Sequence, residues 1–113
     1  MESSIIGKYK LLVVHLSGEL DHHRAQTIRE NIDRELMRRG VRNLAMDFSG
    51  MGFMDSSGLG LVMGRYKKVA AIGGKLIVYG MNENIKKIFR MCGLQRAVIV
   101  AENLEKGMEE LNQ

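Results

Sequence analysis

Residues 47–66 read DFSGMGFMDSSGLGLVMGRY, and this stretch decides how the chain folds. The residues NLAMDF at 43–48, which lead into it, predict a strand that ends near Phe48, and a loop that contains Gly50 and Gly52 is expected to follow. The DSSG sequence at 55–58 then precedes apolar residues at helical spacing, so a helix is predicted to begin there. A strand, a loop and a helix in succession indicate an α/β fold.

The start of this helix carries the candidate functional residues. Asp and Ser accept hydrogen bonds from the free amides of a first helical turn, which predicts Asp55 or Ser56 as the N-cap. Ser57 would then lie just inside the first turn, where the backbone amides do not need its hydroxyl. Gly58 and Gly60 are poor helix formers, and we interpret them as residues that bare the backbone so that another surface can approach closely.

The remainder of the chain alternates in the same way. Strands are expected at 3–8, 10–16, 43–48, 75–79 and 97–100, and helices at 22–39, 55–70, 83–92 and 104–111. Helical crossovers between strands imply a largely parallel sheet, while the first two strands, joined tightly around Tyr9, are expected to pair antiparallel. The prediction is a single α/β domain over residues 1–113, with a mixed four- to five-stranded sheet and about four helices.

Apolar side chains recur on one face of the helices at 22–39 and 83–92. Asn82 is the expected N-cap of the later helix, and Gly93 is expected to end it in a left-handed conformation. Cys92 shares the apolar face of that helix, so we expect it to be a buried residue near the helix end.

Composition excludes several classes of protein. The chain has 113 residues, of which 45% are apolar and 27% are charged, and this suits one compact domain. No apolar run approaches the ~20 residues of a membrane span, and no secretory leader is visible at the start. The single Cys92 cannot form an internal disulfide, which favours a reducing, cytoplasmic setting.

Charge is distributed unevenly along the chain. Residues 65–96 hold eight basic residues against the lone Glu83, whereas residues 1–56 are balanced. Such a run is either an ordinary solvated helix face or a surface suited to an acidic protein partner. Aromatic residues make up only 5% of the chain, and no stacking or base-reading pattern accompanies the charge, so nucleic acid is not an expected partner.

Ser57 is either part of an ordinary helix cap or a modification site. A helix N-terminus attracts negative charge by roughly 0.3–1 kcal/mol, and a phosphoryl group would add about −2 charges there without disturbing the fold. A hydrolytic Ser57 is not expected, because no Gly-x-Ser-x-Gly elbow surrounds it. A nucleotide-phosphate loop is not expected either, because Gly58, Gly60 and Gly64 lack the required lysine and spacing.

A second polar cluster, GELDHH at 18–23, lies between the strand at 10–16 and the helix that follows it. Loops that leave the carboxyl ends of parallel strands converge, so this cluster and the DSSG segment are expected to be neighbours. Asp21 would cap the first helix or hydrogen-bond the hydroxyl of the modification site. His22 and His23 are not expected to bind a metal, since adjacent helical residues point apart and no further ligand completes a site.

Three segments together resemble the STAS-domain anti-anti-sigma factors, which are also called anti-sigma factor antagonists. These segments are GELDHH at 18–23, FMDSSGLG at 53–60 and GRYK at 64–67, and KIFRMCGL at 87–94 resembles the third helix of the family. Within the family, the sequence looks most like the sporulation sigma-F antagonists of endospore-forming bacteria.

The resemblance implies a regulatory protein rather than an enzyme, with no cofactor and no metal site. Ser57 would be phosphorylated by a partner anti-sigma factor that is also an ATP-dependent serine kinase. The unphosphorylated form would bind that partner and release the sigma factor, and a PP2C-like phosphatase would restore this form. The residues expected to support the switch are Asp21, Asp55, Ser56 and Gly58, and those expected to contact the partner are His22, Leu59 and Gly60.

Two alternatives remain open. The first is another STAS role, such as an antagonist in a general stress response or a stressosome-like scaffold component, which keeps the fold and the switch but changes the partner. The second belongs to a different class of protein, namely a small nucleotide-binding or nucleotide-hydrolysing protein. No membrane partner is expected in any of these cases.

Overall fold

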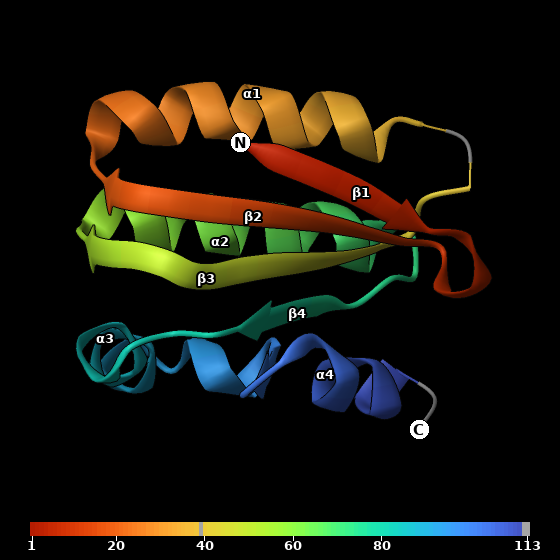
Figure 1. The fold of residues 1–113 in the computed structure, drawn as a ribbon. Helices are drawn as coiled ribbons and strands as arrows, with labels where there is room; N and C mark the ends of the chain where they lie inside the picture. The colour runs from red at the N-terminus through yellow and green to blue at the C-terminus, as the bar shows by residue number, and fades with distance from the viewer. Residues whose placement is uncertain (39, 112–113) are drawn as a thin grey trace.

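A five-stranded sheet in the order β1-β2-β3-β4-β5 forms the centre of the molecule (Figure 1). The computed structural model describes residues 1–38 and 40–111. The strands are β1 (Glu2–Ile6), β2 (Leu11–Leu20), β3 (Asn43–Met54), β4 (Leu76–Tyr79) and β5 (Ile99–Ala101). The helices are α1 (His22–Leu36), α2 (Ser56–Ala71), α3 (Glu83–Cys92) and α4 (Leu104–Leu111), with short 3₁₀ turns at Gly7–Tyr9 and Leu94–Arg96. β1 is antiparallel to β2 and the other neighbouring strands are parallel, so the predicted α/β class and mixed sheet are confirmed.

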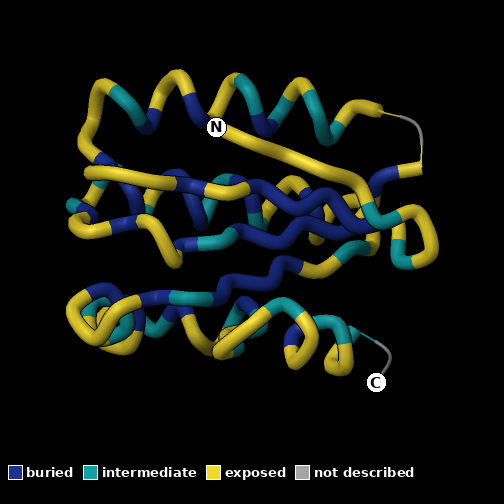
Figure 2. The backbone as a smooth tube through the Cα atoms, in the orientation of Figure 1, coloured by how far each residue is buried: buried dark blue, intermediate teal, exposed yellow. Residues whose placement is uncertain are grey.

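The helices cover the two faces of the sheet unequally. α1, α2 and α3 pack on one face, toward which Val14 and Met46 point, while α4 packs on the other face, toward which Val13 and Ala45 point. The larger core therefore lies between the sheet and the three helices, and the central strands are deeply buried (Figure 2). None of the helices in the described part of the chain is long and apolar enough to cross a membrane.

α1 and α2 begin at the same end of the sheet, because each follows the carboxyl end of a parallel strand. β2 ends at Leu20, which is paired with Met54 at the end of β3. α1 begins at His22 and α2 at Ser56, so the two strand-to-helix junctions lie side by side, at the left of Figure 1. This is the place where parallel α/β sheets bring functional loops together.

β2 and β3 are longer than the strands expected at 10–16 and 43–48. The predicted loop with Gly50 and Gly52 is wrong, because this segment is part of β3 and continues to pair with β2. The register between the two strands shifts twice along the extension. Such irregularities tolerate glycine within a strand, whereas the sequence interpretation took the two glycines as turn residues.

α3 begins and ends where predicted, but the burial of its last residue differs from the prediction. Asn82 caps the helix by accepting a hydrogen bond from the Ile85 amide at 2.9 Å, and Gly93 has the left-handed φ of 73°. Cys92 is exposed, so the expectation that it is buried is wrong. The chain turns back at Gly93, and Leu94, which is 2% exposed, takes the core position instead.

α1 ends at Leu36, earlier than the helix predicted at 22–39. Arg39, its predicted last residue, lies outside the described residues. Gly40, the predicted stop, has a φ of 87°, which is a conformation that glycine adopts without strain.

Asn43 ties together the end of the sheet at which β3 begins. Its side-chain Nδ2 donates to the carbonyl of Tyr9 at 2.8 Å, and its Oδ1 accepts from the amide of Lys75 at 2.8 Å. Asn43 is 8% exposed. A buried amide that is satisfied at both ends fixes which segments meet, since any other arrangement would leave polar atoms unpaired.

Arg65 is buried between α1 and α2, which corrects the expectation of a continuous basic surface over 65–96. It is 4% exposed, and its Nε lies 3.0 Å from Oδ1 of Asp33 on α1. Lys68 approaches the other oxygen of this carboxylate at 3.9 Å. Burial lowers the pKa of Arg65, the charge of Asp33 opposes this effect and the charge of Arg29 adds to it. Arg65 thus joins two helices and is not part of a solvated face.

Candidate functional site

Two aspartates cap the helices that begin at the common end of β2 and β3. Asp21 accepts a hydrogen bond from the Arg24 amide at 2.9 Å, and Asp55 accepts one from the Ser57 amide at 2.8 Å. The Asp55 amide donates in turn to the carbonyl of Leu20 at 3.4 Å. The predicted proximity of the two segments is confirmed, and of the two N-caps considered for α2 the structure has Asp55.

The Ser57 hydroxyl faces His22 across the gap between α1 and α2. Its Oγ lies 3.4 Å from Nδ1 of the imidazole. Asp21, which was expected either to cap the first helix or to contact this hydroxyl, caps its own helix. Ser57 is half-buried, and because Asp55 already satisfies its amide, the hydroxyl is not needed for the helix cap.

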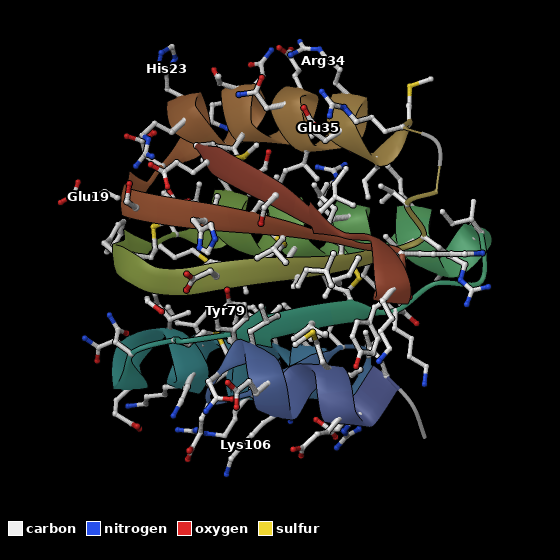
Figure 3. All side chains as sticks on the ribbon, turned by 45° about the vertical axis from the view of Figure 1, so that its right-hand side comes forward. Glu19, His23, Arg34, Glu35, Tyr79 and Lys106 are labelled. Atoms are coloured by element: carbon white, nitrogen blue, oxygen red, sulfur yellow. The ribbon has the colours of Figure 1, made fainter. Side chains whose placement is uncertain are left out.

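His22 and His23 point apart, as expected for adjacent residues of a helix. His23 projects away from the sheet on the outer side of α1 (Figure 3), whereas His22 is directed toward α2 through its contact with Ser57. Two side-by-side helix starts place their first turns next to each other, which brings His22 and Ser57 into contact.

A depression of about 310 Å³ opens beside the hydroxyl, between α1 and α2. Its lining residues are His22, Ala25, Gln26, Arg29, Ser57, Gly60 and Leu61. The space over Gly60 is open, since a Cβ built there would meet no atom within 4 Å. A group attached to the Ser57 oxygen therefore has room beside it, and a visiting protein has access to the backbone of α2.

Gly58 and Gly60 differ in what approaches them. A Cβ at Gly58 would lie 2.1 Å from Cγ of Met54 and 3.0 Å from Cδ2 of Leu20. The surface that approaches Gly58 is therefore the protein's own sheet, which corrects the interpretation that both glycines bare the backbone to an outside surface. Gly60 alone of this pair keeps an open backbone at the surface.

Three further residues surround this corner of the molecule. Ser56 is exposed, and Leu59 is partly buried and packs against the core. Phe53, which the sequence analysis did not single out beyond its place in a motif, is 52% exposed at the end of β3. Its neighbour Met54 points into the core, so strand alternation was the signal that places the aromatic ring outside. Exposed aromatic rings are enriched on protein-binding surfaces.

A further polar cluster, which the sequence analysis did not predict, lies on the face of the sheet that α4 covers. Nδ1 of His15 is 2.7 Å from Oδ2 of Asp47, and the amide and hydroxyl of Ser49 donate to Oδ1 of Asp47 at 2.8 and 2.6 Å. Burial acts to raise the pKa of Asp47, but the hydrogen bonds from Ser49 and His15 outweigh it and lower the pKa. Burial, with the charge of Asp47, raises the pKa of Tyr79 to about 12. The cluster joins three strands and has no contact with Ser57.

Known proteins resemble the chain over most of its length. A family model of the STAS domain matches residues 3–107. The chain is 36% identical to an anti-sigma F factor antagonist of Paenibacillus polymyxa, over 89% of this chain and 86% of that one. It is 29% identical to an anti-sigma-B factor antagonist of Bacillus subtilis, over 85% of this chain and 86% of that one.

Solved structures of one relative agree in fold. The anti-sigma factor antagonist SpoIIAA in its unphosphorylated form is 28% identical, with a TM-score of 0.75 over 96% of this chain and 94% of that one. The phosphorylated form of SpoIIAA from Bacillus is 30% identical, with a TM-score of 0.75 over 97% of each chain. The family match covers both strand-to-helix junctions of the site. The chain therefore belongs to the STAS domain family, within its anti-sigma factor antagonists.

Proposed function

We propose that this protein is a phosphorylation-switched antagonist of an anti-sigma factor. In its unphosphorylated form it binds an anti-sigma factor that is also a serine kinase, and this binding releases a sigma factor. The kinase phosphorylates Ser57, and the phosphorylated form no longer binds. The observation that carries the proposal is the separation of roles at Ser57: its amide belongs to the Asp55 cap, while its hydroxyl faces an open depression.

The phosphorylation step uses ATP held by the kinase. The Ser57 oxygen forms a bond to the γ-phosphorus, the bond from that phosphorus to the bridging oxygen of ADP breaks, and the hydroxyl proton leaves to a base of the kinase. The product is a dianion at an interface with the anti-sigma factor from which water is excluded. A desolvation penalty of roughly 3 kcal/mol would weaken binding a hundredfold or more.

The surrounding residues have distinct parts in this proposal. Asp21 and Asp55 each cap the start of their own helix without using the Ser57 hydroxyl, so the caps remain when Ser57 is modified. Gly58 seats the first turn of α2 on the sheet. The exposed Ser56 lies beside the modified residue, and the proposed docking surface consists of His22, Leu59, Gly60 and Phe53.

Sigma-F is the proposed target of the pathway, and a PP2C-like phosphatase is the proposed reverse enzyme. The identity of 36% to a sigma-F antagonist exceeds the 29% to a sigma-B antagonist, which supports the first partner over the second. A stress-response anti-sigma factor is the second candidate partner. Residues 1–113 act as one STAS domain in the cytoplasm in this proposal, and the protein is a substrate of enzymes rather than an enzyme.

The test is incubation of the chain with the anti-sigma F factor of the same organism and Mg-ATP, followed by mass mapping of the phosphorylated peptide. Ser56→Ala is the matched control, because the two serines are adjacent. We expect Ser56→Ala to be phosphorylated at the parent rate and Ser57→Ala not at all. Phosphate on any residue other than Ser57, or none on the parent chain with either the sigma-F or the sigma-B type kinase, would contradict the proposal.

A further inference from the structure

The interface between α1 and α2 holds more cations than anions. Among residues 1–38 and 40–111, Asp33 is the one carboxylate within ion-pair distance of Arg65, and Lys68 shares it. Arg65 is 4% exposed, and its Nη1 has no hydrogen-bond partner in that part of the chain. The positive charge of this interface is therefore only partly neutralised within the protein.

Arg29 brings positive charge to the depression beside Ser57. It is close enough to Arg65 to lower the pKa of that guanidinium, and it lines the depression together with His22 and Ser57. Within the described ranges no carboxylate lies at ion-pair distance from Arg29. An arginine held beside a second arginine without an anion of its own gains from the arrival of an anion.

The other charged groups at this corner already have partners. Asp21 and Asp55 are the carboxylates that precede the two helices at this corner, and each accepts a hydrogen bond from an amide of its own helix. Arg24 donates from Nη1 to the carbonyl of Glu19 on β2. An incoming anion thus meets two engaged carboxylates, which oppose it, and two available groups, His22 and Arg29, which favour it.

We propose that the phosphoryl group on Ser57 is held within the same chain by His22 and Arg29, in the depression over Gly60. This inference rests on the proposed function, because it takes Ser57 as the phosphorylated residue. The imidazole already lies 3.4 Å from the oxygen that carries the phosphorus. Arg29 lines the same depression from the same helix, and its planar guanidinium suits two phosphate oxygens at once.

The inference changes how phosphorylation blocks the partner. A phosphoryl group that projected freely into solvent could turn aside, and its effect would be mainly electrostatic and sensitive to salt. A group fixed over Gly60 fills the open space that the partner needs and covers the bare backbone of α2. Binding is then prevented by occupied volume even at high ionic strength.

The test uses the complete chain with phosphoserine incorporated at position 57 during translation, so that no kinase is required. Phosphorus NMR follows the second ionisation of the phosphate, whose ordinary pKa is about 6. Cations near the phosphate favour its dianion, so we expect its proton affinity to be at least threefold lower in the folded chain than in the same chain unfolded in urea.

Matched variants identify the groups responsible. His22→Gln and Arg29→Gln should each return a large part of the lost proton affinity, because each removes one of the two side chains proposed to hold the phosphate. The controls are His23→Gln and Arg34→Gln, which make the same replacements on the outer side of α1 (Figure 3) and should leave the titration unchanged. Circular dichroism of all four variants checks that the helix is retained.

Each result decides the matter. An equal phosphate titration in the folded and the unfolded chain overturns the inference, and so does a shift that survives either His22→Gln or Arg29→Gln. The proposed function is judged separately, by calorimetric binding of the anti-sigma factor to the phosphorylated and unphosphorylated chains. If the phosphoryl group on Ser57 shows no shift but still abolishes binding of the anti-sigma factor, the switch holds and the intramolecular site is wrong. If the group shows the shift but binding is unchanged, the intramolecular site holds and the proposed function is wrong.

Discussion

Nδ1 of His22 lies 3.4 Å from Oγ of Ser57, although the two residues are 35 positions apart in the chain. Each belongs to the first turn of its own helix, and each helix is capped by the aspartate that precedes it. The contact therefore depends on two caps and on the pairing of β2 with β3. The surroundings of the Ser57 hydroxyl are thus set by the fold as a whole.

Replacement of Ser57 by Asp should abolish partner binding while the fold is kept. The carboxylate lies at a helix start, where negative charge is tolerated, but it enters the surface that the partner must cover. We expect the dissociation constant for the anti-sigma factor to rise a hundredfold or more by calorimetry, from a penalty of about 3 kcal/mol. Ser56→Asp is the control and should bind within a few-fold of the parent chain. Parent-like binding by Ser57→Asp would defeat the switch.

Loss of the α2 cap should destabilise the protein moderately. Asp55→Ala leaves the Ser57 amide without its acceptor, at a cost of about 1 kcal/mol in the free energy of unfolding. Asp55→Asn keeps a side-chain oxygen at the same place and should lose much less. Urea denaturation followed by circular dichroism measures both. If the two variants unfold at the same urea concentration, the cap is not what stabilises this helix start.

The two glycines of the α2 start should respond to alanine in opposite directions. Gly58→Ala forces a Cβ to within 2.1 Å of Met54 and should destabilise the fold by about 1–3 kcal/mol. Gly60→Ala meets open space and should stabilise the helix by about 0.5–1 kcal/mol. The same Gly60→Ala change should weaken binding of the anti-sigma factor. Thermal unfolding and calorimetry separate these effects, and equal stability changes at both positions would contradict the packing described here.

Removal of Asp33 should cost more than removal of an ordinary surface carboxylate. Asp33→Ala leaves the buried guanidinium of Arg65 without its counter-ion, and we expect a loss of about 2–3 kcal/mol. The side chain of Asp33 is 28% exposed, which keeps the loss below that of a fully buried pair. Glu30→Ala, on the exposed side of the same helix, serves as the control and should change stability by less than about 0.5 kcal/mol. Chemical denaturation of the two variants gives the comparison.

Tyr79 should ionise at a higher pH than an ordinary tyrosine. Its pKa in the folded state is about 12, above its ordinary value of 10.0, so it favours the folded state at pH values below 10 and this contribution is lost as the pH rises from 10 toward 12. Absorbance at about 295 nm should show one delayed ionisation step, which Tyr79→Phe removes. Three tyrosines that titrate together in the folded protein would be the contrary result.

Asp47 acts in the opposite pH range. Its pKa is lowered in the folded state from the ordinary 3.8, so it stabilises the fold above that pH and the contribution is lost as the pH falls below 3.8 through the folded-state pKa. Asp47→Asn should therefore lower stability at neutral pH and flatten the loss of stability on acidification. Urea midpoints measured between neutral pH and pH 3 provide the check, and parallel curves for the two proteins would exclude this role.

Local signals in the sequence were enough for much of the fold. The N-cap at Asn82 and the left-handed Gly93 were predictable, because Asn is strongly preferred at the start of a helix and Gly in the left-handed residue that ends one. The antiparallel hairpin and the parallel crossovers followed from connection length. The extension of β3 through Gly50 could not be predicted, because it depends on pairing with a distant strand rather than on local preference.

The candidate site was predictable in part for the same reason. The proximity of Asp21 and Asp55 follows from the topology of a parallel sheet, and the structure confirms it. The contact of His22 with Ser57 was not predicted, because the direction of a side chain at a helix start depends on angles within one turn. The burial of Arg65 was not predicted, because its counter-ion Asp33 lies on another helix and the distribution of charge along the chain does not reveal such a pair.

The amide of Asn43 has one further consequence. It links the connection between β1 and β2, the first residue of β3 and the residue before β4, at the end of the sheet remote from Ser57. The strand register is thereby fixed far from the corner that contains Ser57. Substitutions around that corner can accordingly change its surface without disturbing the alignment of the strands.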